Sequence, residues 1–267
     1  MERQGKTSHH SPILNVMITA AYKAARGLTR DFGEIENLQV SRKGPGEFVT
    51  ASDMNSEKTL RYELSKARPN YSFLLEESGE ILGEDTEHTW IVDPLDGTTN
   101  FLHGVPHFAI SIGLKKKNEI IAGVIYDPIK DEMFIAEKGR GAFMNDRRLR
   151  VSSRRDFHTC LLGTGVTMAN PQHHGQFLES IGKILPVSAG LRRMGSASLD
   201  LAYVAAGRLD GYWEYTLKPW DVAAGIILVR EAGGVITQLD GQPKGPDEGS
   251  VLAGNPFVQE QLIKILR

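Results

Sequence analysis

One stretch decides how this sequence is interpreted: Trp90-Ile91-Val92-Asp93-Pro94-Leu95-Asp96-Gly97-Thr98-Thr99-Asn100-Phe101. It begins with a short apolar run that predicts a strand, and the run is followed by two carboxylates, Asp93 and Asp96. Pro94 fixes its own φ near −65° and has no amide donor, so the connection between the two acids is stiff. Both acids can therefore face the same point.

The residues after the second acid suit an anion. Gly97 permits a close approach of the backbone, and Thr98, Thr99 and Asn100 are typical of a helix start, whose free N–H groups bind oxyanions. Mg²⁺ prefers oxygen ligands and is commonly held by carboxylates, waters and substrate phosphate. The stretch therefore predicts a cation and a phosphate bound side by side. Taken alone, Asp-Pro-Leu-Asp-Gly also fits an ordinary surface turn with a helix cap.

Two more acidic segments favour the metal site over the surface turn. Glu76-Glu77 ends the strand candidate Phe73–Leu75, and Asp221 opens a helix after Pro219. Each has a simpler interpretation by itself: Glu77 is a solvated acid, and Asp221 is a first-turn acid stabilised by the helix dipole. Separate elements that all end in acid are harder to explain in this way, so the combination predicts one shared site.

The apolar pattern divides the chain into two halves. Apolar residues recur at helical spacing over residues 13–28 and again over 60–67, where Pro69 closes the second helix. Residues 107–151 are strand candidates separated by turn signals, which predicts an antiparallel meander. Its strands are expected at Phe108–Leu114, Ile120–Tyr126, Met133–Ala136 and Ala142–Met144.

After Ser153 the pattern alternates between strands and helices. Strands are expected near residues 161–166, 211–215, 234–239 and 251–253, and helices near 196–206, 222–232 and after Pro256. We therefore predict an α+β half over residues 1–152, with a mainly antiparallel sheet that binds metal and phosphate. An α/β half over residues 153–267 is expected to complete the site.

The composition is that of an ordinary soluble globular protein: of 267 residues, 40% are hydrophobic and 24% are charged. Lys and Arg (31) nearly balance Asp and Glu (33), which gives no strong attraction to nucleic acid or an anionic membrane. A single cysteine, Cys160, excludes an internal disulfide and favours the reducing cytoplasm. The longest apolar run, Val222–Val229, is far shorter than the roughly 20 residues that span a bilayer, so no membrane span is expected.

The same motifs resemble those of the inositol monophosphatase family, in its bacterial form, within the lithium-sensitive, metal-dependent phosphatases. The resemblance covers nearly the whole chain. It rests on Glu76-Glu77-Ser78, Trp90–Phe101 and Trp220–Gly225, supported by Phe48–Asp53, Gly141–Asn145, Gly195–Ala197 and Tyr212–Tyr215. It implies a layered α-β-α-β-α sandwich, a homodimer and Mg²⁺ as the cofactor.

Carried over residue by residue, the resemblance implies two to three Mg²⁺ ions per active site. One would be bound by Glu76, Asp93 and the carbonyl of Leu95. A second would be bound by Asp93, Asp96 and Asp221. A third, weaker ion would contact Glu76 through waters, with Asp53 nearby.

The resemblance also assigns catalytic and substrate roles. Glu76, Thr98 and Asp53 would be catalytic, and Glu76 and Thr98 would position and deprotonate the attacking water. The substrate would contact the residues Asp96, Gly97, Thr98, Thr99, Ala197, Glu214 and Asp221. Glu214 has an alternative as the outward residue of an alternating strand. Lys43 matches a loop lysine of bacterial members.

The reaction implied is hydrolysis of inositol 1-phosphate to inositol and phosphate, by in-line attack of a metal-activated water. Fructose 1,6-bisphosphate, histidinol phosphate or a nucleotide 3′-phosphate are alternatives, because related enzymes share the metal core. A regulatory RNA- or protein-binding module is an alternative of another class. It would use the basic cluster formed by Arg147, Arg148, Arg150, Arg154 and Arg155. The near-zero net charge and the absence of interleaved aromatics disfavour nucleic acid.

Overall fold

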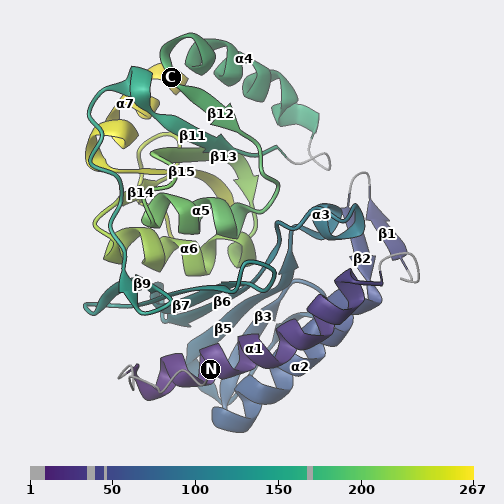
Figure 1. The fold of residues 1–267 in the computed structure, drawn as a ribbon. Helices are drawn as coiled ribbons and strands as arrows, with labels where there is room; N and C mark the ends of the chain where they lie inside the picture. Colours follow the sequence, from purple (N-terminus) through teal and green to yellow (C-terminus); the bar gives the residue numbers. More distant parts are fainter. Residues whose placement is uncertain (1–9, 35–39, 45–46, 167–170) are drawn as a thin grey trace, which may run out of the picture.

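Two β-sheets, with helices between and outside them, form the fold in this computed structural model (Figure 1). The structure describes residues 10–34, 40–44, 47–166 and 171–267, and of residues 40–44, 47 and 48 it describes the backbone alone. The layers run from helices α1 and α2 through the large sheet, helices α5 and α6 and the small sheet to helices α4 and α7. This order confirms the predicted α-β-α-β-α sandwich.

The first two helices cover the outer face of the large sheet (Figure 1). Helix α1 (Pro12–Phe32) begins where Ser11 Oγ accepts a hydrogen bond from the amide of Leu14, and its predicted apolar stripe is buried. Helix α2 (Ala51–Ala67) begins with a reciprocal cap between Thr50 and Asp53. The apolar pattern predicted only the second part of α2. The short strands β1 (Val40–Gly44) and β2 (Glu47–Thr50) precede it as an antiparallel pair.

The large sheet contains eight strands in the order β10-β9-β8-β7-β6-β5-β3-β4. Their bounds are β3 (Tyr71–Leu75), β4 (Gly79–Ile81), β5 (Asp85–Asp96), β6 (Ala109–Lys116), β7 (Glu119–Asp127), β8 (Glu132–Glu137), β9 (Gly141–Met144) and β10 (Arg147–Arg148). Consecutive strands from β5 to β10 pair antiparallel, which confirms the predicted meander. Strands β3 and β5 are parallel, so their carboxyl ends meet at one edge, where the amide of Glu76 donates to the carbonyl of Val92 at 3.2 Å.

The strand that carries the first two acids is longer than predicted. We expected it to end at Val92, but β5 continues to Asp96. Its pairing with β6 is irregular between Asp93, opposite Ser111, and Asp96, opposite Ala109. Pro94 lies inside this irregularity, because a residue without an amide hydrogen cannot continue a regular ladder. The acids therefore lie on a bulged strand end, followed directly by helix α3 (Thr98–Leu102).

The small sheet has the order β12-β11-β13-β15-β14 and mixes parallel with antiparallel pairs. Its strands are β11 (Leu161–Thr164), β12 (Gly190–Arg192), β13 (Gly211–Leu217), β14 (Val235–Thr237) and β15 (Gly249–Gly254). The helices are α4 (His174–Ile184), α5 (Ala197–Ala205), α6 (Pro219–Glu231) and α7 (Pro256–Leu266), with 3₁₀ turns at Phe157–Thr159, Pro171–His173 and Leu185–Val187. The predicted alternation of strands and helices is confirmed.

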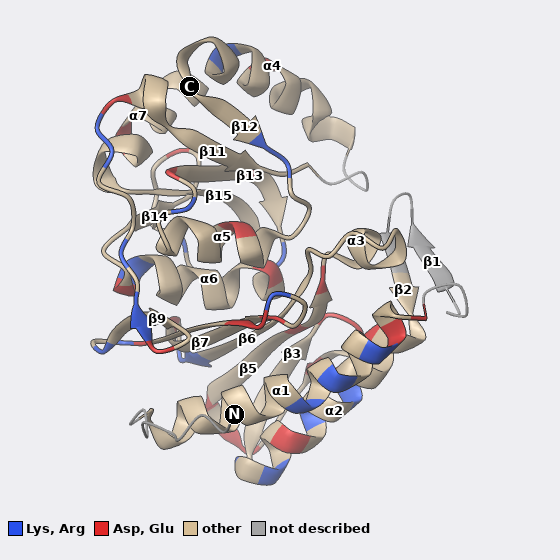
Figure 2. Cartoon of the chain, in the orientation of Figure 1, with Lys and Arg blue, Asp and Glu red and all other residues tan. Residues whose placement is uncertain are grey.

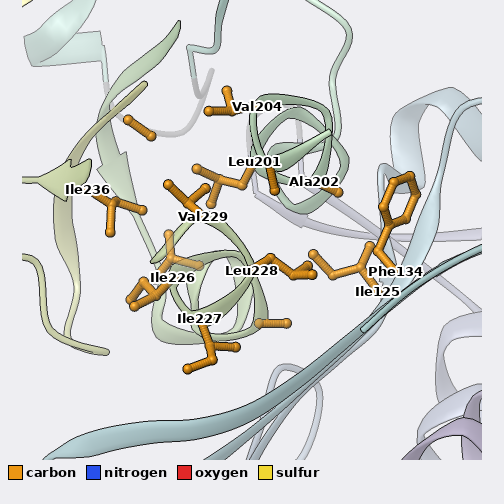
Figure 3. Close-up of a cluster of buried hydrophobic side chains, with 14 of the residues drawn as sticks. Ile125, Phe134, Leu201, Ala202, Val204, Ile226, Ile227, Leu228, Val229 and Ile236 are labelled. Atoms are coloured by element: carbon orange, nitrogen blue, oxygen red, sulfur yellow. The ribbon is translucent and has the colours of Figure 1, made fainter. Parts of the chain in front are cut away.

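The main core lies between the two sheets, around α5 and α6 (Figure 3). Leu201 of α5 and Ile227 of α6 lie in the same cluster as Phe134 of the large sheet and Ile236 of the small sheet. Because α6 is buried on nearly every side, its apolar run belongs to a core helix. No helix in the described part of the chain has the length and apolar character needed to cross a bilayer. The domain boundary between residues 152 and 153 stays a prediction.

Glycines on the large sheet let α6 approach closely. A Cβ atom added to Gly113 would lie 2.7 Å from the Cβ of Ala223, and one added to Gly123 would lie 2.6 Å from Cγ2 of Ile227. Neither place has room for a methyl group. The position of α6, and with it the first turn of that helix, is therefore set by near contact between helix and sheet backbone.

Candidate metal and phosphate site

Three structural elements bring the four predicted metal-binding carboxylates into one electrostatic field. Glu76 follows β3, Asp93 and Asp96 lie at the end of β5, and Asp221 is in the first turn of α6. Burial raises the pKa of Asp93 well above its ordinary value, and the charges of Glu76, Asp96 and Asp221 raise it further. Burial also raises the pKa of Asp221, followed by the charges of Asp96 and Glu76. The four acids are near enough to repel one another.

Protein hydrogen bonds hold one oxygen of three of these carboxylates. Asp93 Oδ1 accepts from the amide of Leu95 at 2.9 Å, and Asp221 Oδ2 accepts from the amide of Lys218 at 2.7 Å. Asp96 Oδ2 accepts from Ser196 Oγ at 2.6 Å and from the Ser198 amide at 2.8 Å and hydroxyl at 2.5 Å. The contacts of Asp96 join the large sheet to the start of α5.

The donors of this site suit a hard cation. All four side chains supply carboxylate oxygen, the ligand that Mg²⁺ prefers. Figure 2 shows acidic segments of α5 and α6 on the same side of the molecule as the end of β5. Within the described residues, no three His, Cys, Asp or Glu side chains are spaced as the shell of a single ion. Like charges that raise one another's pKa are stabilised when a cation neutralises them.

The predicted water-positioning residues lie beside the carboxylates. Thr98 Oγ1 lies 3.2 Å from Asp53 Oδ1 and 3.0 Å from the carbonyl oxygen of Leu95, and it can donate to either. Burial raises the pKa of Asp53, while hydrogen bonds from Thr50 and Thr98 oppose the rise. The structure thus brings Asp53, Thr98 and Leu95 together, and the catalytic roles of these residues stay predictions.

The start of α3 requires a glycine. Gly97 has φ of +96°, in the left-handed region, and a Cβ there would lie 3.1 Å from the carbonyl oxygen of His107. The first hydrogen bond of the helix runs from the amide of Phe101 to the carbonyl of Gly97 at 3.0 Å. The amides of Thr98 and Thr99 precede that bond, so they belong to the first turn, where N–H groups have no partner within a helix.

The predicted contacts to the alcohol half of the substrate lie on α5 and β13. Ala197 is the first residue of α5, between the two serines that bind Asp96. Glu214 is buried and accepts a hydrogen bond from the hydroxyl of Tyr212, so its alternative as an outward strand residue is wrong. Burial raises the pKa of Glu214 to about 7, with a further rise from the charge of Asp96.

Sequence reasoning missed several groups that surround the acids. Ser196 was noted only as part of a motif, and Ser198 and Asp200 were not considered. Asp200 is buried on α5, and its Oδ1 finds no hydrogen-bond partner among the described residues. Burial raises the pKa of Asp200 well above its ordinary value, followed by the charges of Glu214 and Asp96. The available signal was a serine at the predicted helix start, which is typical of an N-cap.

Two further predictions concern basic residues. Lys43 lies in β1, but its side chain is outside the described residues. The predicted basic cluster, Arg147, Arg148, Arg150, Arg154 and Arg155, is exposed. Within it, Arg154 Nε lies 3.2 Å from Oδ1 of the buried Asp210. That contact fixes one member of the cluster to the strand region beside β11.

Comparisons with known proteins find relatives of similar sequence and fold. Residues 9–267 match the model of the inositol monophosphatase family. A Mesorhizobium japonicum protein named inositol-1-monophosphatase is 54% identical over 96% of this chain and 97% of its own. An Escherichia coli protein named Nus factor SuhB is 41% identical over 96% of each chain. The crystal structure of the extragenic suppressor protein suhB from Bartonella henselae has a TM-score of 0.92 at 52% identity, covering 96% of this chain and 99% of that one.

Proposed function

The chain belongs to the inositol monophosphatase family, and we propose that it hydrolyses inositol 1-phosphate to inositol and phosphate with Mg²⁺. The observation that carries the proposal is the group of four acids, Glu76, Asp93, Asp96 and Asp221, in one electrostatic field. A relative that is 54% identical and named inositol-1-monophosphatase supports this choice of substrate. The presence of every matching carboxylate favours an enzyme over a regulatory binding module.

We propose two to three Mg²⁺ ions in this site. Glu76, Asp93 and the carbonyl of Leu95 would hold one, and Asp93, Asp96 and Asp221 another. A third would be held more weakly beside Glu76 and Asp53. The all-oxygen donor set and the mutual repulsion of the acids support this assignment. When bound, the ions would neutralise the phosphate dianion and polarise the attacking water.

The residues of the chain would orient that water for in-line attack. A Thr98 hydroxyl that donates to Asp53 leaves its lone pairs free to accept a hydrogen bond from water. Burial raises the pKa of Asp53, which makes its carboxylate a stronger proton acceptor at the end of this short relay. Glu76 would accept from the same water on its other side. Direct attack by water inverts configuration at phosphorus.

Backbone and side chains would hold the two halves of the substrate. The amides of Gly97, Thr98 and Thr99 at the start of α3 would donate to phosphate oxygens. Glu214, fixed by Tyr212, would accept from a hydroxyl of the inositol ring, and Asp221 and Ala197 would contact the ring from the neighbouring helices. A polyol presents several hydroxyl donors, and carboxylate oxygens are suited to accept from them.

A phosphate-release screen tests the substrate. Purified protein with Mg²⁺ is offered inositol 1-phosphate, fructose 1,6-bisphosphate, histidinol phosphate and a nucleotide 3′-phosphate at equal concentration. We expect the largest kcat/KM with inositol 1-phosphate. A larger kcat/KM for another compound of the panel would make that compound the preferred substrate, and the proposed hydrolysis by a metal-activated water would still apply. Retention of configuration with an isotopically chiral phosphate would contradict direct attack by water.

We also propose that the protein is a homodimer in the cytoplasm. The family resemblance supports the dimer, and the single cysteine, Cys160, supports a reducing compartment. Light scattering of the purified protein tests the dimer, and a monomeric mass would contradict it. Fractionation of the source cells tests the compartment, and recovery outside the cytoplasm would contradict that assignment.

A further inference from the structure

A buried acid on α2 holds the turn that follows Glu76. Glu57 is only 3% exposed, and its Oε2 accepts from the amide of Glu77 at 2.9 Å. Its Oε1 accepts from the hydroxyl of Ser78. One carboxylate therefore binds two consecutive residues of the turn with both of its oxygens, across 20 residues of sequence. Hydrogen bonds to an ionised acceptor are about twice as strong as neutral ones.

The same face of α2 contacts two more segments of the site. Ser56 Oγ donates to the carbonyl of Pro94 at 2.8 Å, and Asp53 Oδ1 lies 3.2 Å from Thr98 Oγ1. Residues three and four positions apart share one helix face, so Asp53, Ser56 and Glu57 form one polar stripe. The stripe contacts the turn after Glu76, the end of β5 at Pro94 and the water-positioning Thr98.

Glu76 is fixed from two sides. On one side its amide donates to the carbonyl of Val92 at 3.2 Å, which ties it to β5 and the other acids. On the other side Glu57 holds the next two residues of the chain. The turn is short, because β3 ends at Leu75 and β4 begins at Gly79. Without Glu57 the turn would keep its strand anchors but lose the contact that orients it toward α2.

We propose that Glu57 is a positioning residue that fixes the Glu76-Glu77-Ser78 turn against α2 and thereby raises the affinity of the site for Mg²⁺. The inference rests on the proposed function. It is separable from a general role in folding, because Leu60 and Leu64 of α2 are fully buried and anchor the helix independently of Glu57. Loss of Glu57 should therefore weaken Mg²⁺ binding, while saturating Mg²⁺ restores most of kcat.

Calorimetric titration with Mg²⁺ tests the proposal on the full chain. Outer residues that orient metal ligands change metal affinity by about 10- to 100-fold, so Glu57→Ala should weaken Mg²⁺ binding by that factor. Glu57→Gln should weaken it less, because the amide oxygen can still accept from Glu77 and the amide nitrogen can donate to Ser78 Oγ. Glu63→Gln on the same helix is the matched control. Glu63 pairs with Lys23 of α1 at 2.8 Å, and affinity should stay within about twofold, as for a surface pair.

The outcomes separate this inference from the proposed function. Wild-type protein that binds no Mg²⁺ would overturn both. Wild-type protein that binds Mg²⁺, with Glu57→Ala binding it equally well, would overturn the positioning role alone. If Glu57→Ala does not fold, Ser78→Ala replaces it. That variant removes one of the two hydrogen bonds from an exposed residue, and a loss of about two- to tenfold is expected. Unchanged affinity in both Ser78→Ala and Glu57→Gln would then overturn the proposal.

Discussion

A methyl group added at Gly113, where the large sheet packs against α6, should change the geometry of the site without contacting it. In Gly113→Ala the new Cβ would lie 2.7 Å from the Cβ of Ala223. Carbon atoms in ordinary contact are about 3.5–4.0 Å apart, so sheet and helix must separate by roughly 1 Å at this point. Ala223 is two residues after Asp221, and Gly113 pairs with Ile91, two residues before Asp93. A separation at this point should therefore move Asp221 of α6 away from Asp93 and Asp96 of β5.

The magnitude follows from that displacement. Overpacking of a close-packed core costs about 1–3 kcal/mol in the free energy of unfolding. Misplacement of a catalytic group by about 1 Å lowers activity by up to about 100-fold. We therefore expect Gly113→Ala to remain folded, with kcat/KM for inositol 1-phosphate reduced by about 10- to 100-fold. Phosphate release with Mg²⁺ and denaturant unfolding measure the two effects.

A compensating change supplies the control. Ala223→Gly removes the methyl group that the new Cβ on β6 would meet, so the double variant should recover most of the activity that the single variant loses. Its free energy of unfolding should stay about 1 kcal/mol below wild type, because a glycine now lies inside a helix. Wild-type activity in Gly113→Ala, or a double variant no more active than the single one, would show that the contact between Gly113 and Ala223 does not set the geometry of the site.

Three other predictions concern single side chains of the site. Asp93→Asn should fold but lose Mg²⁺-supported phosphate release by at least about 100-fold, because Asp93 is proposed to bind both ions. Near-normal turnover in this variant would remove Asp93 from the mechanism. Thr98→Ala should lower kcat by about 100-fold or more with little change in KM, and Thr98→Ser should restore it; an unchanged kcat in the alanine variant would exclude the hydroxyl. Folding raises the pKa of Glu214 from 4.5 to about 7, so the stability it contributes is complete below about pH 4.5 and is lost as the pH rises through 7. The measurement is the free energy of unfolding by denaturant in EDTA, for wild type and for Glu214→Gln. Between pH 4.5 and pH 8 the wild-type value should fall by about 3 kcal/mol more than that of the variant. If the two free energies change with pH in the same way, the carboxyl of Glu214 does not have the raised pKa.

Periodicity predicted the elements whose faces are apolar. Helix α1 and strands β6 to β8 were predicted because one or both of their faces enter the core. The first half of α2 was missed for the opposite reason. Its buried residues there are Ser52, Asp53, Ser56 and Glu57, which pack against polar turns and leave no apolar stripe. A helix face that supports a polar site does not have the pattern of a core helix.

The acids could be predicted, but their supports could not. Asp93 and Asp96 are marked locally by the proline and glycine around them. The hydrogen bonds from Ser196 and Ser198 to Asp96 join residues about 100 positions apart in the sequence. The contact of Glu57 with Glu77 joins α2 to the turn after β3. Such contacts depend on how the sheets and helices finally pack, which no local pattern records. The strand end expected at Val92 was wrong because a bulge carries β5 past Pro94.

Phosphate release from inositol 1-phosphate, measured with Mg²⁺ and with EDTA, shows whether the protein is a cation-dependent phosphatase. The four acids are proposed to act through the cations they bind, so purified protein should release phosphate with Mg²⁺ present. It should release none in EDTA and should recover when Mg²⁺ is added in excess. Release at the same rate in EDTA, or no release by folded protein at any Mg²⁺ concentration, would contradict a role for bound cations in hydrolysis.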